Sequence, residues 1–222
     1  MLLITCVIIM VVLMLCFYQN RIYRITNWKL LIAVLLMVFT GFISVHLMFY
    51  IERNAWGGRS FFGCVFMVPP VIYIYAKIVK IKTEYLMDIA GPVCAITLTL
   101  MKLHCLYEEC CGGIILTEKA NGIVIRFPSQ IIEAICGLII CLVLLHLQRK
   151  QEYRGNIAPI FLIMYGTSRY ILDFFRIDLT IIRFLEGTGI YLTEGHFWAL
   201  ICIIWGLIWL NHRRKKEYRL SN

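Results

Sequence analysis

The sequence predicts an all-α integral membrane protein with seven transmembrane helices. Hydrophobic residues make up 61% of the 222 residues, whereas charged residues make up only 16%. The mean hydropathy is +0.80, and the charged residues gather between long apolar runs. Soluble globular domains carry about a quarter charged residues, so this composition indicates a chain that folds in a bilayer.

Seven apolar runs have about the length that a helix needs to cross roughly 30 Å of hydrocarbon. They lie near residues 2–18, 29–50, 61–80, 86–103, 131–148, 157–175 and 196–211. Each run must be helical, because backbone groups that face lipid need hydrogen-bond partners within the segment. No repeat or Gly/Ser-rich linker divides the runs, so we expect one polytopic membrane domain over residues 1–222.

The positions of Lys and Arg predict the topology. The formal net charge is +9, and 14 of the 22 basic residues follow alternate apolar runs, within residues 21–29, 77–82, 149–154 and 213–219. Basic loops stay in the cytoplasm, which predicts an outside N-terminus and a cytoplasmic C-terminus. The charge is thereby explained by topology, and no nucleic-acid partner is expected.

Three of the ten cysteines, Cys105, Cys110 and Cys111, fall in the loop after the fourth run, on the predicted outer side. Disulfides persist in oxidising compartments, so a bridge is one interpretation, although the spacing does not decide the pairing. A zinc site that also used His104 is disfavoured, because adjacent Cys110 and Cys111 cannot easily face one ion. We expect no metal and no cofactor.

Ionisable residues interrupt the end of the sixth run. Tyr165, Arg169, Asp173 and Arg176 are four, four and three residues apart, so on a helix they share one face. A charge in hydrocarbon costs about 2.5–3.5 kcal/mol on insertion scales, and a functional site is therefore the leading interpretation. The alternative is an Arg169–Asp173 pair that neutralises itself or reaches the headgroups.

Four segments of the chain, in order, resemble motifs of the bacterial prolipoprotein diacylglyceryl transferases. They resemble the family's Gly-Gly-x-Ser-Phe-His-Gly, Gly-Arg-x-Gly, Arg-His-Pro-Ser-Gln-x-x-Glu and Tyr-Gly-x-x-Arg motifs, and the last two are the most specific. The segments are Gly57–Gly63, Met101–Gly113, Arg126–Glu133 and Tyr165–Asp178. Gly195-His196 is similar to a Gly-Gln pair of the family.

The resemblance implies a seven-helix enzyme of the bacterial cytoplasmic (inner) membrane that moves a diacylglyceryl group from phosphatidylglycerol to the lipobox cysteine of prolipoproteins. It implies that Arg169 holds the lipid phosphate, Asp173 orients it and Tyr165 bonds to the headgroup. Lys102 falls on the family's signature arginine and completes the implied catalytic set. His104 stands where the family has a glycine, and we expect it to act as a substitute base, with a histidine that only packs at the interface as the alternative. The implied substrate-binding residues are Arg126, Ser129, Gln130, Glu133, Asp173, Arg176, Gly57 and Gly58.

Four of the candidate positions differ from the family pattern. Phe62 replaces a histidine, and Lys102 replaces an arginine, which keeps the charge but not the bidentate fork. His104 replaces a glycine, and Asp173 replaces a glutamate and keeps its charge. A non-catalytic relative that binds lipid or signal peptides is therefore an alternative to the transferase. A membrane thiol–disulfide protein that uses Cys105, Cys110 and Cys111 is a second alternative.

Overall fold

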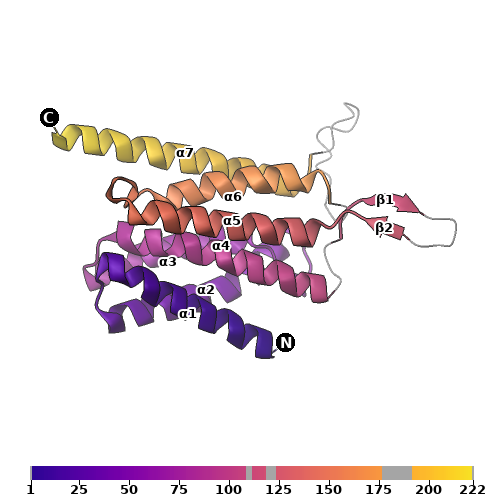
Figure 1. Cartoon of the computed structure of the whole chain (residues 1–222), viewed down its shortest axis with the longest axis horizontal. Coiled ribbons are helices and arrows are strands. Elements are labelled where there is room, and N and C mark those ends of the chain that lie inside the picture. Colours follow the sequence, from indigo (N-terminus) through magenta and orange to yellow (C-terminus); the bar gives the residue numbers. More distant parts are fainter. Residues whose placement is uncertain (1, 109–111, 119–123, 177–191, 222) are drawn as a thin grey trace. The chain divides into compact units, whose positions relative to one another are not determined.

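The computed structural model describes residues 2–108, 112–118, 124–176 and 192–221, and most of them are helical (Figure 1). The α-helices are α1 (Leu2–Tyr23), α2 (Asn27–Arg53), α3 (Phe62–Val79), α4 (Thr83–Tyr107), α5 (Ser129–Arg149), α6 (Ile157–Asp173) and α7 (Glu194–Ser221). The remaining elements are the strands β1 (Ile115–Glu118) and β2 (Val124–Arg126) and the short 3-10 helix η1 (Gln151–Tyr153).

Each predicted apolar run coincides with one helix, and most helices extend past the predicted ends. The second, for example, covers residues 27–53 rather than 29–50, because a helix continues through polar residues beyond the hydrocarbon. Among the described residues, six helices are long and apolar enough to span a membrane. The exception is α6, which has 17 residues. An all-helical, multi-pass membrane protein agrees with these helices, while the count of seven spans and the orientation stay predictions.

The chain divides into two compact units that interleave along the sequence. Unit 1 comprises Met1–Thr97 and Cys141–Phe161, and unit 2 comprises Leu98–Ile140 and Leu162–Asn222. One part of each of α4, α5 and α6 therefore belongs to unit 1 and the other part to unit 2. The expectation of one domain over residues 1–222 stays a prediction.

In unit 1, α1, α2 and α3 lie side by side (Figure 1). The backbones of α2 and α3 approach so closely that a Cβ atom at Gly63 would overlap the carbonyl group of Ser44. The backbone N–H of Ser60 donates to the carbonyl of Val45 at 2.9 Å, which closes the connection between the two helices. Close backbone contact through glycine is typical of membrane helix pairs.

A buried carboxylate, Asp88, joins three segments of unit 1. It accepts a hydrogen bond from the Tyr23 hydroxyl at 2.9 Å and one from the Ile157 backbone N–H at 3.1 Å. It also accepts a hydrogen bond from the Gly155 backbone N–H. The first N–H groups of a helix have no partner within it, so Asp88 satisfies donors at the start of α6.

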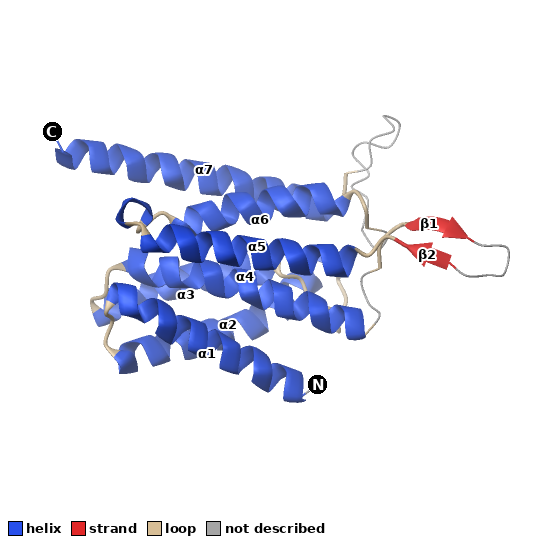
Figure 2. Ribbon diagram, in the orientation of Figure 1, coloured by secondary structure: helices blue, strands red, loops and turns tan. Residues whose placement is uncertain are grey.

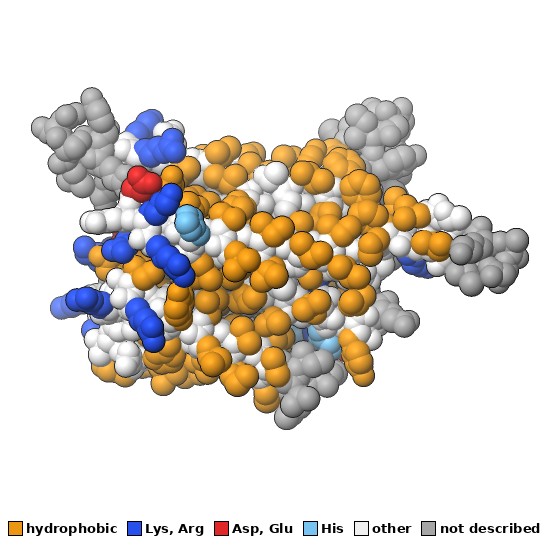
Figure 3. Space-filling model, viewed as in Figure 1, with side chains coloured by type: hydrophobic (Ala, Val, Ile, Leu, Met, Phe, Trp, Pro, Cys, Tyr) orange, Lys and Arg blue, Asp and Glu red, His pale blue; other side chains and the backbone are white. Residues whose placement is uncertain are grey.

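Basic side chains gather at one end of unit 1, as the space-filling view shows (Figure 3). Lys29 Nζ donates to the Val79 carbonyl at 3.2 Å, and Arg149 Nη2 donates to the Tyr18 hydroxyl at 2.8 Å. The end of α1, the start of α2 and the ends of α3 and α5 therefore lie at the same level. These segments contain three of the four clusters of basic residues found in the sequence, 21–29, 77–82 and 149–154. Helices that run in alternating directions bring such clusters to the same end.

In unit 2, β1 and β2 form an antiparallel hairpin before α5 (Figure 2). The all-α prediction did not include this hairpin. The runs Ile115–Thr117 and Val124–Ile125 are rich in β-branched residues, which favour strands. The base of the hairpin is fixed to the segment after α6, where the Ile114 N–H donates to the Phe175 carbonyl at 3.0 Å.

Candidate functional site

A single carboxylate, Glu133 near the start of α5, collects three cations of unit 2. Its Oε2 atom lies 2.8 Å from Lys102 Nζ and 2.8 Å from Arg169 Nη1. Arg176 Nη1 lies farther away, 3.6 Å from Oε1. The Glu133 side chain is only 4% exposed, so these charges interact with little screening by water.

Arg169 bridges two carboxylates. Besides Glu133, it contacts Asp173 one turn later on α6, with 3.0 Å between Nη2 and Oδ1. This contact agrees with the spacing of four residues that predicted a shared helix face. Arg169 is 12% exposed and Asp173 is fully buried, so the guanidinium is enclosed in protein. The planar fork of arginine suits two carboxylates at once.

Lys102, Glu133, Arg169, Asp173 and Arg176 together form what we call the Glu133 cluster. Three cations face two carboxylates in this cluster, so these five largely buried side chains carry a formal charge of +1. Buried charge is costly unless it is paired. The cluster is therefore suited electrostatically to a ligand with one negative charge.

Arg176, the last of the four ionisable residues predicted to share one helix face, lies beyond the end of α6. The helix α6 ends at Asp173, and Arg176 forms an isolated β-bridge with Gly113. The predicted helix face therefore extends only as far as Asp173, because the chain turns at residues 174–175. The base of the hairpin instead fixes the backbone of Arg176, and the rings of Phe127 and Phe175 stack there at 4.7 Å.

Two predicted site residues make their contacts outside the Glu133 cluster. His104 is buried near the end of α4, where its Nε2 atom lies 3.2 Å from Glu108 Oε1. Its Nδ1 atom is buried and has no hydrogen-bond partner in the described part of the chain. Arg126 lies exposed on β2, and its guanidinium would be 3.4 Å from a Cβ atom at Gly112.

Three further predicted residues are buried in unit 2. Tyr165 lies on α6 four residues before Arg169 and is 2% exposed. Ser129 and Gln130 begin α5 next to each other, and the Ser129 hydroxyl donates weakly to Gln130 Oε1 at 3.5 Å. Because Glu133 is on the same turn of α5 as Ser129 and Gln130, these polar residues lie near the Glu133 cluster along the helix.

The predicted glycine residues lie in unit 1. Gly57 has a φ of +109°, which only glycine adopts easily. A Cβ atom at Gly58 would overlap the Phe49 ring, and the Gly58 carbonyl lies 3.0 Å from His46 Nδ1. Phe62, where the family motif has histidine, is buried at the start of α3. Cys110 and Cys111 lie outside the described residues, as do residues 177–191.

The structure adds one polar residue for which the sequence predicted no role. His196 lies in the first turn of α7, is 1% exposed, and contacts the rings of Tyr170 and Phe174. The preceding residue, Gly195, packs against the carboxylate of Asp173, which a Cβ atom there would overlap. The one sequence signal at this position is the similarity of Gly195-His196 to a Gly-Gln pair of the family, which assigned no role to the histidine.

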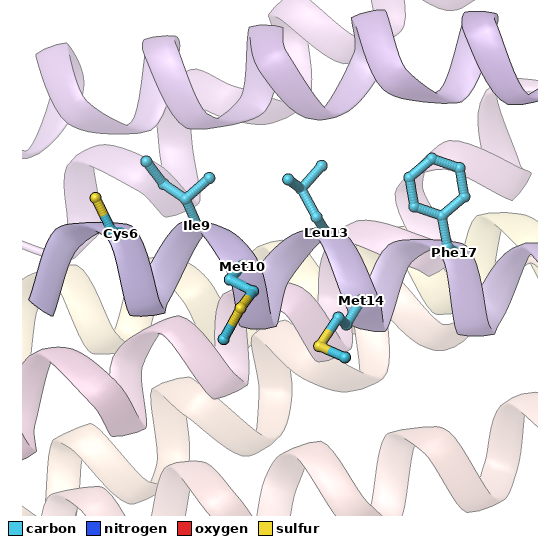
Figure 4. A pocket seen from close by; sticks show the side chains of 6 residues that line it. All are labelled: Cys6, Ile9, Met10, Leu13, Met14 and Phe17. Carbon is cyan, nitrogen blue, oxygen red and sulfur yellow. The ribbon is translucent and has the colours of Figure 1, made fainter. Parts of the chain in front are cut away.

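An apolar groove on α1 of unit 1 has a different character (Figure 4). Its lining residues are Cys6, Ile9, Met10, Leu13, Met14 and Phe17. Met10 and Met14 are more than half exposed. Such a face suits contact with acyl chains, and the lining carries no charged group that could bind a headgroup or activate a thiol.

Comparison with known proteins assigns the family. A family model described as prolipoprotein diacylglyceryl transferase matches residues 1–211. The chain belongs to the prolipoprotein diacylglyceryl transferase family. This result agrees with the resemblance found in the four sequence motifs.

Individual relatives of this family are distant. Each of the following is named phosphatidylglycerol–prolipoprotein diacylglyceryl transferase. The relative from Idiomarina loihiensis is 31% identical over 179 residues, which cover 77% of this chain and 64% of the relative. The relative from Aliarcobacter butzleri is 28% identical over 209 residues, which cover 84% and 75%. The relative from Teredinibacter turnerae is 31% identical over 160 residues, which cover 68% and 55%. The chain thus spans between about half and three quarters of the length of these relatives.

Proposed function

We propose that this chain moves a diacylglyceryl group from phosphatidylglycerol to the lipobox cysteine thiol of prolipoproteins. The observation that carries the proposal is the formal charge of +1 on the five described side chains of the Glu133 cluster. The phosphodiester of phosphatidylglycerol has one negative charge, which is equal and opposite. Arginine binds phosphate through paired N–H groups, and Arg169 and Arg176 both belong to the cluster.

The proposed reaction is a displacement at carbon. The cysteine sulfur attacks the glycerol carbon that bears the phosphate ester, so that an S–C bond forms and the C–O bond breaks. Glycerol phosphate leaves with the electron pair, and its phosphate gains a second negative charge. Fixed cations in a site that excludes water stabilise such developing charge, an effect often worth about 3–4 kcal/mol per group. Lys102, Arg169 and Arg176 are the groups proposed for this task.

The thiol must lose its proton before or during the attack, and His104 is the proposed base. If His104 Nε2 donates to Glu108, the neutral ring has a free lone pair on Nδ1, which is the buried atom without a partner in the described part of the chain. A carboxylate that orients an imidazole in this way is typical of general bases. His104 would thus supply a base, which Phe62, at the position of the family's histidine, cannot do.

The remaining predicted residues are proposed to position the substrates. Tyr165 would bond to the lipid headgroup, and Asp173 would orient Arg169 against the phosphate. Ser129, Gln130 and Arg126 would contact polar groups of the substrate near the start of α5. Gly57 and Gly58 would permit close approach of the backbone to a substrate.

The proposed setting is the bacterial cytoplasmic membrane. We propose that α6 is the seventh span, although it is shorter than the other six. With seven spans in one domain, the basic end of unit 1 would face the cytoplasm and the N-terminus would lie outside. The lipobox cysteine of a translocated prolipoprotein would then meet the enzyme from the outer side.

Complementation of a bacterium depleted of its own transferase tests the proposal. Wild type should restore growth and Arg169→Ala should not, while both accumulate to equal levels in the membrane. Lys150→Ala, which removes an exposed basic residue of unit 1, is the matched control and should grow like wild type. Failure of verified wild-type protein to support growth would contradict the proposal.

Lipid copurification and cysteine variants, measured alongside complementation, separate the alternatives. A non-catalytic lipid-binding relative would not support growth, yet phosphatidylglycerol would still copurify with it. A thiol–disulfide protein would tolerate Arg169→Ala and lose its function with Cys110→Ser or Cys111→Ser. The proposed transferase predicts the reverse pattern for these variants.

A further inference from the structure

The ring of His196 is held in one tautomer by a neighbouring residue. The backbone N–H of Thr193 donates to His196 Nδ1 at 3.2 Å, and the Thr193 hydroxyl lies 2.7 Å from the same atom. That hydroxyl oxygen also accepts a hydrogen bond from the His196 backbone N–H at 3.3 Å. Because Nδ1 accepts these bonds, the neutral ring carries its proton on Nε2.

The Nε2–H group is a buried donor with no hydrogen-bond acceptor in the described ranges. The imidazole is enclosed by Phe174, at 4.2 Å between ring centroids, and by Tyr170, at 4.9 Å. Buried donors almost always have a partner, so an isolated one points to a ligand or an ordered water.

A buried acceptor, the Asp173 carboxylate, lies against the turn of α7 that carries His196. Both oxygens of Asp173 are buried and accept no hydrogen bond from the residues that the structure describes, although Oδ1 forms the ion pair with Arg169. The first turn of α7 approaches this carboxylate at Gly195, the residue before His196. His196 is close enough to Asp173 and Arg169 to interact electrostatically with both.

The two groups together define the chemistry of a ligand. A hydroxyl can donate to Asp173 and accept from His196 Nε2–H at the same time. A phosphate oxygen can only accept and would be repelled by Asp173, while an ammonium group can only donate. A neutral hydroxyl therefore satisfies the pair best.

We propose that Asp173 and His196 bind a hydroxyl of the glycerol headgroup, and that this contact makes the site selective for a lipid with a hydroxylated headgroup. Thr193 acts as a positioning residue, because it fixes the tautomer of His196. The inference rests on the proposed function, since it places the headgroup next to a phosphate held by Arg169.

Phosphatidylpropanol tests this assignment, because it has the same single negative charge as phosphatidylglycerol and no headgroup hydroxyl. We expect wild type to prefer phosphatidylglycerol in kcat/KM by about 10- to 100-fold, which is the range for one unsatisfied buried hydrogen-bonding group. In His196→Phe the preference should fall below about threefold, through a loss on phosphatidylglycerol alone. His212→Phe changes an exposed histidine of the same helix and should keep the wild-type preference.

Thr193→Val removes the hydroxyl from His196 Nδ1 and leaves the Thr193 backbone N–H bonded there, so it loosens the ring without changing its tautomer. It is the second variant if His196→Phe does not fold. It should lower the preference at least about threefold. A wild type that uses both lipids equally overturns the inference. So does an unchanged preference in the variant, which would mean that the His196 N–H only packs against the rings of Tyr170 and Phe174.

A binding measurement separates this inference from the proposed function. If wild type transfers from neither lipid, the transferase proposal fails, and displacement of labelled phosphatidylglycerol from the purified protein becomes the test. Stronger displacement by phosphatidylglycerol than by phosphatidylpropanol, lost in the Thr193→Val variant, supports the inference. Equal displacement by the two lipids overturns it.

Discussion

Replacing Glu133 with glutamine should strongly destabilise unit 2, because Lys102, Arg169 and Arg176 all share this carboxylate. The change preserves the size of the side chain and removes its charge. Arg169 keeps its ion pair with Asp173, whereas Lys102 and Arg176 lose the only ion pairs that they form within the described residues. Removing one partner of a buried ion pair costs about 3–5 kcal/mol. The discount for solvent is small here, because the cations are only 9–12% exposed.

This loss of unfolding free energy corresponds to a lower melting temperature. For chains of 150–250 residues, 1 kcal/mol shifts the midpoint by roughly 2–4 °C, so Glu133→Gln should lower it by about 6–20 °C. The assay is thermal unfolding of the purified protein in detergent, followed by tryptophan fluorescence. Glu152→Gln, an exposed carboxylate of η1, is the control and should change the midpoint by no more than about 2 °C.

A double variant identifies the cause. Adding Arg176→Gln to Glu133→Gln removes one of the stranded cations, so the two changes should destabilise by about 0.5–3 kcal/mol less than their sum. A Glu133→Gln protein that melts within about 2 °C of wild type would refute the reasoning. It would mean that water reaches the cations and screens them.

Three further substitutions test close contacts and buried bonds. Gly195→Ala should reduce diacylglyceryl transfer at least tenfold, since a Cβ atom there displaces the Asp173 carboxylate; a wild-type transfer rate would contradict this. Asp88→Asn should lower the unfolding free energy by about 1–3 kcal/mol, because the charged acceptor at the start of α6 is lost; an unchanged melting midpoint would show that the cap contributes nothing. Gly63→Ala should lower the melting midpoint, because its Cβ atom would overlap the Ser44 carbonyl, and equal midpoints for variant and wild type would disprove that clash.

The helices could be predicted because their determinant is local. A run of apolar residues long enough to cross the hydrocarbon must be helical, whatever it packs against. The same local rule placed Arg169 and Asp173 on one face of α6, and the contact at 3.0 Å agrees. The end of α6 was less predictable, because Phe174 and Phe175 are as apolar as the helix that they follow.

The partners of Arg169 could not be predicted from spacing. Lys102 and Glu133 belong to different helices from Arg169, and only the packing of unit 2 determines that Lys102 and Arg169 share the Glu133 carboxylate. The hairpin had a weak signal in the β-branched residues of 115–117 and 124–125. His196 was marked only by the similarity of Gly195-His196 to a family motif, because its burial and the contact of Gly195 with Asp173 come from packing.

The most direct test of the lipid site is transfer by the purified protein in proteoliposomes. A synthetic lipobox peptide is incubated with phosphatidylglycerol, and mass spectrometry follows the thioether-linked diacylglyceryl group on its cysteine. We predict that wild type and Lys150→Ala modify the peptide at similar rates, while Arg169→Ala is slower by about 10²–10³-fold. Equal rates for Arg169→Ala and wild type would contradict the claim that these buried cations hold the lipid phosphate.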